Sequence, residues 1–193
     1  MKAIAIFTAD DSNPGSIMIQ EATGGKWSHV AIGFEKDDPR NPIVYFESSC
    51  DHDSGSSEDG LRGPLPFKEL IRWQCKDEQH RRLQMVDIYL DAERAMTSFK
   101  FLLSMVGHIH YAHLQVILNM SALLFPLQIV RRYASREHWT CSEAFARAMP
   151  YDIQIKALKV GEVTYDYIMP SGSRLPSVFD GVRAWNQAHG LPG

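Results

Sequence analysis

The tetrapeptide at positions 140–143 reads Thr-Cys-Ser-Glu. A threonine followed three residues later by glutamate is the capping-box pattern that begins a helix. Pro150 cannot donate the next helical hydrogen bond, so we expect a helix from Cys141 to Met149. The unpaired N–H groups and the positive dipole end at the start of a helix stabilise a thiolate. The pattern therefore predicts a nucleophilic cysteine at Cys141, with a small buried apolar residue as the alternative.

A nucleophilic cysteine needs a base within hydrogen-bond reach, and the base needs an acceptor that orients it. Among the eight histidines of the chain, His29 is on a predicted strand, which would hold its ring rigidly. Glu47 is near the end of the next predicted strand. If the two strands pair, this carboxylate would fix the tautomer of His29 and support its imidazolium. The alternatives are a half-buried polar histidine and a solvated glutamate.

Length and composition limit the class of protein. The chain has 193 residues, of which 45% are hydrophobic and 22% are charged, as expected for a single domain with its own core. The formal net charge is −3, so the chain has no electrostatic signature of nucleic-acid binding. We expect no cofactor, and the oligomeric state is left open.

Cysteine usage and the N-terminal residues bear on the compartment. Three cysteines at irregular spacing, Cys50, Cys75 and Cys141, argue against a disulfide framework. Reduced thiols fit a cytoplasmic setting. The first apolar stretch ends at Ala9, which is too short for the apolar region of a signal peptide. We expect a cytoplasmic protein, with export by another route left open.

The chain predicts an α+β fold in which helices pack on an antiparallel sheet. Expected strands are Lys2–Thr8, Gly15–Ile19, Ser28–Phe34, Ile43–Ser48 and Gln84–Leu90, with Val163–Ile168 extended. Expected helices are Ala92–Val106 after an Asp91 cap, Cys141–Met149 and Ser177–His189. Cys50–Gly63 is rich in serine, aspartate and glycine, which is typical of a surface loop. Cys75 and His80 are expected in a charged loop.

The longest apolar run is Leu114–Val130, and Pro126 interrupts it. It is shorter than a comfortable transmembrane helix, so we expect no membrane-spanning segment. The favoured interpretation is a core helix that ends near Phe125. The alternative is an apolar flap beside the active site that meets a lipid or an acyl chain, which would give peripheral lipid contact.

Three motifs together resemble a known family. Trp27–Gly33 reads Trp-Ser-His-Val-Ala-Ile-Gly, Val44–Ser48 reads Val-Tyr-Phe-Glu-Ser, and Trp139–Glu143 reads Trp-Thr-Cys-Ser-Glu. Their order, histidine, then glutamate, then cysteine, resembles the circularly permuted branch of the NlpC-type papain-like superfamily, the bacterial YiiX-like branch. Gly107–Tyr111 is similar to a segment that precedes the cysteine in those proteins. The chain has Gly-Ser-Ile at 15–17, where the family often has Gly-Asp-Ile.

The resemblance implies a single permuted papain-like domain over residues 1–193, with a helical insertion or flap around 108–135. It implies a thiol hydrolase or acyltransferase that cleaves an amide or ester bond. Cys141 would attack the carbonyl, His29 would move the proton, and Glu47 would orient His29. The Cys141 N–H would form part of the oxyanion hole. Substrates across the superfamily include peptides, peptidoglycan stem peptides and lipid acyl groups.

Four residues near these motifs are candidates for substrate binding. Trp27 and Trp139 flank the proposed base and nucleophile in sequence, and either walls the cleft or packs in the core. Tyr111 matches a family tyrosine that would donate a hydrogen bond to the site, with core packing as its alternative. Ser142 follows the nucleophile directly.

Other functions compete with this prediction. The run from His108 to His113 suggests a metal site, but no cysteine or carboxylate follows at a standard zinc spacing. The same fold without catalysis would be a lipid- or peptide-binding module. An interaction protein, such as a phage or effector component, is a third possibility. The occupied cysteine, histidine and glutamate positions favour the enzyme.

Overall fold

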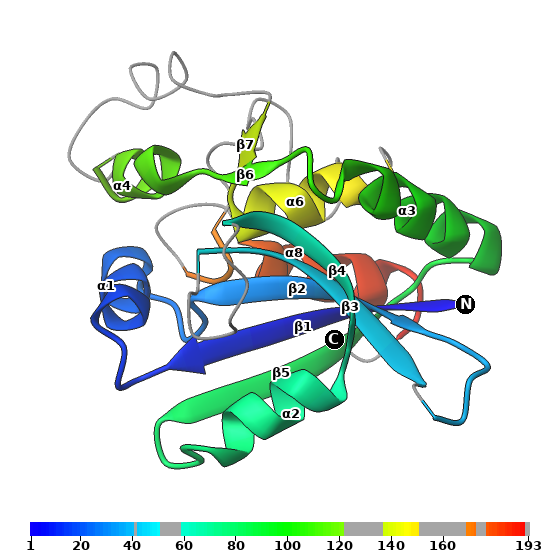
Figure 1. Ribbon diagram of the computed structural model, residues 1–193, viewed down its shortest axis with the longest axis horizontal. Coiled ribbons are helices and arrows are strands. Elements are labelled where there is room, and N and C mark those ends of the chain that lie inside the picture. Colours follow the sequence, from blue (N-terminus) through cyan, green and yellow to red (C-terminus); the bar gives the residue numbers. More distant parts are fainter. Residues whose placement is uncertain (41, 51–58, 122–136, 151–168, 173–176, 192–193) are drawn as a thin grey trace.

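The computed structural model describes residues 1–40, 42–50, 59–121, 137–150, 169–172 and 177–191. It is an α+β structure in which an antiparallel sheet is surrounded by helices (Figure 1). The strands are β1 (Lys2–Asp10), β2 (His29–Glu35), β3 (Ile43–Ser49), β4 (Gly60–Pro66), β5 (Arg81–Ile88), β6 (His110–Tyr111) and β7 (His138–Trp139). The helices are α1 (Pro14–Thr23), α2 (Lys68–Cys75), α3 (Ala92–Met105), α4 (His113–Ser121), α6 (Cys141–Ala148) and α8 (Val178–Ala188).

Five strands form the main sheet in the order β4-β3-β2-β1-β5, and every neighbouring pair is antiparallel. The predicted hairpin of β2 and β3 is confirmed, with a ladder that runs from Glu35–Ile43 to Ile32–Phe46. Beyond Phe46, the residues of β3 pair with β4. The two short strands β6 and β7 pair in parallel, and they bring residue 111 beside residue 139.

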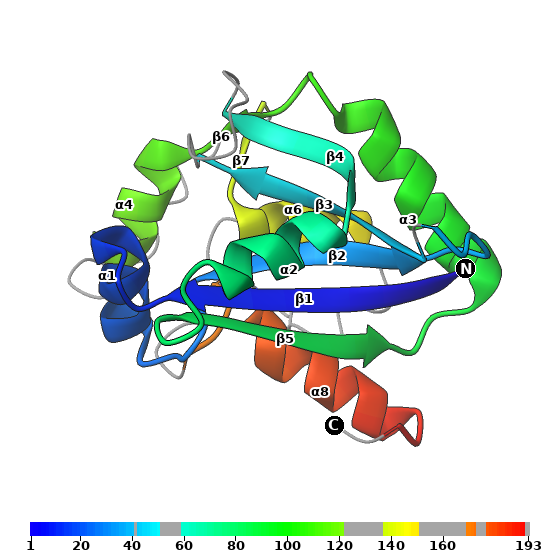
Figure 2. The same cartoon turned by 60° about the horizontal axis from the view of Figure 1, so that its bottom comes forward.

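Successive side chains of a strand point to opposite faces of the sheet, and both faces are covered. On one face, Phe7 and Phe34 join a large core with residues of α3, α6 and α8. On the other face, Ile6 packs in a smaller core with Leu70 of α2. Figure 2 shows the sheet between α2 and the helices of the larger core. The helix that begins at Cys141 therefore rests on β2 and β3.

The prediction of a strand at Gly15–Ile19 is wrong, because these residues belong to helix α1. The Asn13 side chain caps this helix by accepting hydrogen bonds from the N–H groups of Gly15 and Ser16. Pro14 follows at the first helical position, where its missing N–H removes no helical bond. The cap and the proline outweigh the strand preference of the two isoleucines in this stretch.

The segment from Gly60 onward also differs from expectation. The loop predicted for Cys50–Gly63 ends earlier, because β4 begins at Gly60 and pairs with β3. Residues 51–58 of that prediction lie outside the described residues. Cys75 is the last residue of α2, whereas a loop was predicted there. Both elements depend on tertiary contacts that the local sequence does not show. Strand β4 pairs with β3, and helix α2 packs against β5.

Helices α3, α6 and α8 agree with the predicted bounds to within one residue at each end. The Asp91 side chain accepts from Arg94 N–H at the start of α3, as predicted. Ser177 caps α8 in the same way. The extended segment predicted at 163–168 lies outside the described residues. In the described part of the chain, no helix combines the length and the apolar character needed to cross a membrane.

Candidate active site

Cys141 is the first residue of helix α6. The predicted cap is present, because the Thr140 hydroxyl accepts a hydrogen bond from the Glu143 N–H at 3.2 Å. The Glu143 carboxylate accepts two bonds from Arg147, one turn along the helix, at 2.9 and 2.7 Å. Met149 ends the helix directly before Pro150. Only 6% of the Cys141 surface is exposed, so its thiol lies at the buried, positive end of α6.

His29 is the first residue of β2, and several hydrogen bonds fix the backbone just before it. The Ser28 N–H donates to the carbonyl of Thr8, which is the partner of His29 in the ladder with β1. The Ser28 and Ser16 hydroxyls lie 2.7 Å apart, which ties the start of β2 to α1. The His29 side chain is 21% exposed. The ring is thus held firmly while one part of it reaches the surface.

Glu47 connects His29 to a third side chain, Arg62. The ladder between β2 and β3 ends at the Ile32–Phe46 pair, and the register of β3 with β4 shifts between Tyr45 and Glu47, so the regular alternation of side chains does not extend to Glu47. Glu47 Oε2 is 3.0 Å from His29 Nε2. Arg62 Nη2 donates to Glu47 Oε1 at 2.7 Å from strand β4. Both carboxylate oxygens therefore have cationic or hydrogen-bonding partners, as a buried carboxylate requires.

A further contact ties this strand to the cysteine helix. The Ser48 hydroxyl donates to the carbonyl of Trp139 at 2.8 Å. Ser48 follows Glu47, and Trp139 precedes the Thr140 cap by one residue. Residues that are almost a hundred positions apart are thereby held at a fixed distance, which is what a preorganised site needs.

The pKa values of the site point to a charged pair. Burial alone lowers the pKa of His29, but the thiolate charge of Cys141 and hydrogen bonds to Cys141 and Glu47 raise it from 6.5 to about 10. Burial alone raises the pKa of Cys141, but the charge of His29 and its hydrogen bond lower it below 9.0. The directions agree, and near neutral pH they favour a thiolate beside an imidazolium.

Two other groups donate to the Cys141 sulfur. The Val30 N–H and the Ser142 hydroxyl each hydrogen-bond Cys141 and contribute to its lowered pKa. The Ser142 oxygen is 3.9 Å from Sγ. Because Nε2 of His29 contacts Glu47, Nδ1 is the ring nitrogen left for the thiol. The pKa of Glu47 is raised by burial and lowered further by His29 and Arg62, so it is a carboxylate at neutral pH.

Tyr111 lies close enough to Cys141 for the charge of the thiolate to change the pKa of its hydroxyl. Burial and the negative charges of Cys141 and Cys50 raise the pKa of Tyr111 well above 10.0. The phenol therefore keeps its proton and can donate it in a hydrogen bond. Tyr111 is the partner of Trp139 in the β6–β7 pair, so the same short sheet positions it next to the start of α6.

The two tryptophans lie in the core. Trp27 is 4% exposed and packs near Phe7 and Phe179, with ring centroids 6.2 and 6.4 Å away. Trp139 is buried and stacks on Phe101 at 6.1 Å. Both tryptophans therefore pack in the core, which was the alternative to a role in the cleft. Of the four substrate-binding candidates, Ser142 and Tyr111 are the ones that lie near the Cys141 thiol.

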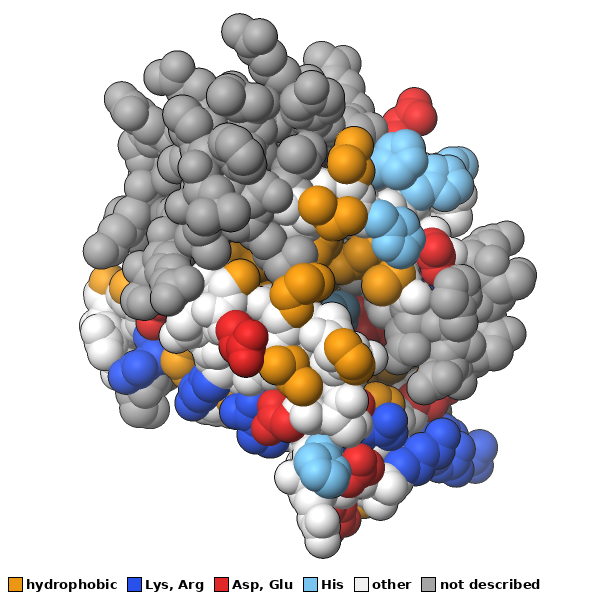
Figure 3. Space-filling view, turned by 90° about the vertical axis from the view of Figure 1, so that its left-hand side faces the viewer, with side chains coloured by type: hydrophobic (Ala, Val, Ile, Leu, Met, Phe, Trp, Pro, Cys, Tyr) orange, Lys and Arg blue, Asp and Glu red, His pale blue; other side chains and the backbone are white. Residues whose placement is uncertain are grey.

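The described part of the apolar run is helix α4, which begins two residues after Tyr111. The core-helix interpretation is wrong for its first turns, because Leu114 and Ile117 are 59% and 56% exposed. Residues 122–130 lie outside the described residues. Figure 3 shows the face that carries α1 and α4, where hydrophobic and histidine side chains lie together. Met18 of α1 adds a further exposed apolar side chain.

The histidines near α4 do not form a ligand set. His110 belongs to strand β6 and His113 begins α4, so the two do not share one helix face. His113 Nε2 is 3.1 Å from the Asp59 carboxylate. The ring of His110 lies 5.5 Å from that of His138. Within the described ranges, no group of three or more histidine, cysteine or acidic side chains is arranged to hold a metal ion.

Sequence reasoning missed Arg62. Its role depends on β4 pairing with β3 across a loop, and it lies fifteen residues from Glu47 in the chain. The only local signal is an arginine between Leu61 and the Gly63-Pro64 pair, and nothing in that signal names a partner.

Comparison of the chain with models of known protein families, with curated proteins and with solved structures finds no match. The resemblance to permuted NlpC-type hydrolases therefore rests on the three motifs alone and stays a prediction.

Proposed function

We propose that this protein is a cysteine-dependent hydrolase or acyltransferase with a permuted papain-like fold, acting through Cys141, His29 and Glu47. The main support is the contact of one imidazole with both a buried carboxylate and a thiol of lowered pKa at a helix start. A nucleophile, a base and an orienting acceptor in this arrangement are what acyl transfer through a cysteine requires.

In the first half-reaction, the Cys141 thiolate attacks the carbonyl carbon of an amide or ester, and the carbonyl oxygen takes the negative charge. The backbone N–H of Cys141, which has no partner within α6 because it is at the start of the helix, donates to this oxyanion. The Tyr111 hydroxyl is the proposed second donor, because it is protonated and close to the thiol. When the tetrahedral intermediate collapses, His29 gives its proton to the leaving amine or alcohol.

In the second half-reaction, a thioester joins the acyl group to Cys141. Neutral His29 removes a proton from water or from an acceptor alcohol or amine, which then attacks the thioester carbonyl. The acyl product leaves and the thiolate–imidazolium pair is restored. Glu47 keeps Nε2 engaged in both halves and stabilises each imidazolium state.

The exposed apolar side chains on α4 favour a substrate with an apolar acyl or side-chain portion. Leu114 and Ile117 are exposed on a helix that begins two residues after Tyr111, the proposed second donor to the oxyanion. Burial of one such side chain contributes about 1.5–3 kcal/mol, enough to prefer an apolar ligand over a polar one.

The test is acylation by activated esters. Incubation with p-nitrophenyl acetate and p-nitrophenyl octanoate, followed by peptide mapping, should place the acyl group on Cys141. Cys141→Ala should abolish the adduct, His29→Ala should slow it, and Cys75→Ala should leave it unchanged. Faster acylation by octanoate would support the apolar substrate. Acylation of Cys141 no faster than that of Cys75 would overturn the proposal and favour a non-catalytic binding module.

A further inference from the structure

Strand β5 is at the end of the five-stranded sheet, and α8 lies beside its outer edge (Figure 2). The carboxamide of Asn186 binds this edge as a neighbouring peptide group would. Its Nδ2 donates to the carbonyl of Asp87 at 2.6 Å, and its Oδ1 accepts from the Tyr89 N–H at 3.1 Å. The edge is therefore able to accept main-chain-like partners.

The backbone N–H and C=O groups of Met85 also point outward from the free edge of β5. In an antiparallel ladder, alternate residues direct both N–H and C=O groups to the same side. Asp87 directs its carbonyl outward to Asn186, so Met85, two residues earlier, also directs its N–H and C=O groups outward. In the described part of the chain, no hydrogen bond occupies these two groups of Met85.

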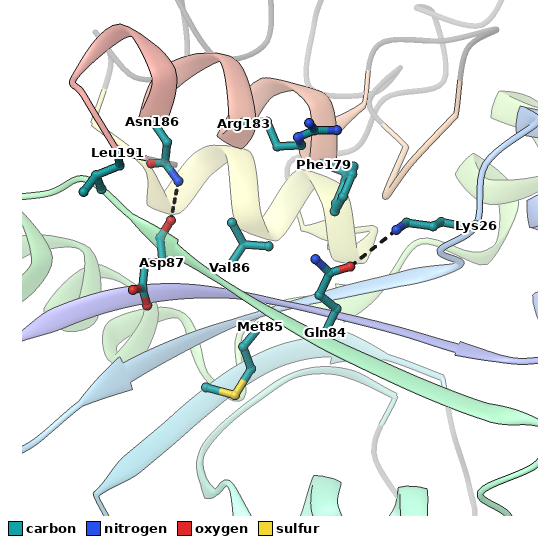
Figure 4. A pocket seen from close by; sticks show the side chains of 9 residues that line it. All are labelled: Lys26, Gln84, Met85, Val86, Asp87, Phe179, Arg183, Asn186 and Leu191. Carbon is teal, nitrogen blue, oxygen red and sulfur yellow. Dashed lines mark hydrogen bonds between the residues drawn. The ribbon is translucent and has the colours of Figure 1, made fainter. Parts of the chain in front are cut away.

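A cavity of about 380 Å³ lies along this stretch between β5 and α8. Consecutive residues from Gln84 to Asp87 line it, and Figure 4 shows the Met85 side chain directed away from α8. Met85 thus contributes its backbone to the cavity. Three strand steps span about 10 Å, which is the length of roughly three extended residues.

Two cations stand at the Gln84 end of the cavity. Lys26 Nζ is 3.5 Å from Gln84 Oε1 and 5.0 Å from the ring of Phe179. The Arg183 guanidinium is 5.7 Å from the same ring, on its own helix α8. Among the described residues, no carboxylate pairs with Lys26 or Arg183. This end of the cavity is therefore suited to an anionic group.

We propose that this cavity binds the last residues of an extended peptide, with the main chain paired to Met85 and the terminal carboxylate between Lys26 and Arg183. Addition of a strand to a sheet edge and capture of a C-terminal carboxylate are established ways to bind peptides. The site is separate from the Cys141 thiol and does not depend on the proposed catalytic activity.

Fluorescence anisotropy with a labelled Ala-Thr-Val-Thr peptide tests the proposal on the full chain. The free-acid form should bind saturably with a dissociation constant below about 1 mM, and the C-terminal amide should bind about tenfold more weakly, a loss of about 1.4 kcal/mol. Equal binding of acid and amide, or no saturation below about 10 mM, would overturn the proposal.

Variants separate the two halves of the site. Lys26→Met and Arg183→Met should each weaken binding of the free acid and leave binding of the amide unaffected, whereas Lys100→Met, at an exposed position of α3, is the matched control. Met85→Pro removes the outward N–H at an edge position where proline is tolerated, and it should weaken both peptides. Met85→Leu keeps the N–H and should bind as the wild type does. The proposed site would be contradicted if Lys100→Met weakened binding of the free acid as much as Lys26→Met or Arg183→Met does. It would also be contradicted if Met85→Pro bound both peptides as tightly as the wild type.

Discussion

The carboxylate of Glu47 meets the imidazole of His29 with 3.0 Å between Oε2 and Nε2. Because Glu47 is 7% exposed, this contact lies in a setting where charge is poorly screened. The same carboxylate is held from its other side by Arg62. The pair therefore determines both the orientation of the base and the charge that it carries.

Replacement of Glu47 by glutamine tests the charge of the pair. Glu47→Gln keeps the size and a hydrogen bond to His29 but removes the negative charge that helps to raise the pKa of His29. We expect acyl transfer to slow by about tenfold or more, a loss of at least about 1.4 kcal/mol. Esterase rates measured across pH check this, and the descending limb at high pH should move to lower pH. An unchanged esterase rate and an unchanged pH profile would show that Glu47 has no role in catalysis.

Arg62→Met tests the support behind Glu47. Glu47 keeps its contact with His29, but its buried Oε1 loses the hydrogen bond from Arg62, so we expect a loss of about 3 kcal/mol in the free energy of unfolding. Arg94→Met is the control, because Arg94 pairs with Asp91 at the exposed start of α3 and should cost less than about 1 kcal/mol. Urea denaturation of both variants provides the comparison, and equal losses would contradict a special role for Arg62.

The dependence of stability on pH follows from the two displaced pKa values. The folded pKa of His29 is raised from 6.5 to about 10, so its stabilisation is complete below 6.5 and is lost as pH rises toward 10. The folded pKa of Cys141 is lowered from 9.0, so its stabilisation is complete above 9.0 and is lost as pH falls through the lowered value. Between 6.5 and 9.0 the two changes oppose each other.

We therefore expect the extra stability of the wild type over the double variant Cys141→Ser/His29→Asn to be level from the lowered pKa of Cys141, or from about pH 6.5 if that pKa is lower still, up to about pH 9. It should decrease above that range. Urea denaturation at several pH values measures it. A difference that changes steadily through this interval would mean that the pair is not an ion pair in the folded chain.

Tyr111→Phe tests the proposed second oxyanion donor. Loss of one such donor costs about 100-fold in acyl transfer. Alkylation of Cys141 by iodoacetamide develops no oxyanion, so its rate should change little. Tyr89→Phe, at an exposed ring stacked on His189, is the matched control. Equal slowing of alkylation and acyl transfer would indicate that Tyr111 acts through the packing around the thiol.

Local signals in the sequence predicted much of the candidate site. The Thr140 cap, the stop before Pro150 and the β2–β3 hairpin each depend on residues close in the chain, and each is present. The hairpin brings His29 and Glu47 near each other, and their contact forms just beyond the regular ladder, where the register of β3 has shifted.

The features that the sequence did not predict depend on non-local strand pairing, on competing local signals in one segment, or on tertiary placement. Arg62 reaches Glu47 only because β4 pairs with β3, and no local pattern names that partner. At Gly15–Ile19 the cap at Asn13 and the alternating isoleucines favour different structures, and the cap prevails. The exposure of Leu114 reflects tertiary placement, which an apolar run does not reveal.

The rate of Cys141 alkylation by iodoacetamide across pH tests the central claim most directly. Cys75 is the internal control, since it is exposed and its pKa is raised by desolvation and by the charge of Glu78. We predict that near neutral pH Cys141 reacts at least about tenfold faster than Cys75 despite its burial, and that its rate levels off at a lower pH than the rate of Cys75 does. His29→Ala should remove this advantage. A Cys141 that reacts no faster than Cys75 near neutral pH would contradict the thiolate–imidazolium pair and the catalytic role built on it.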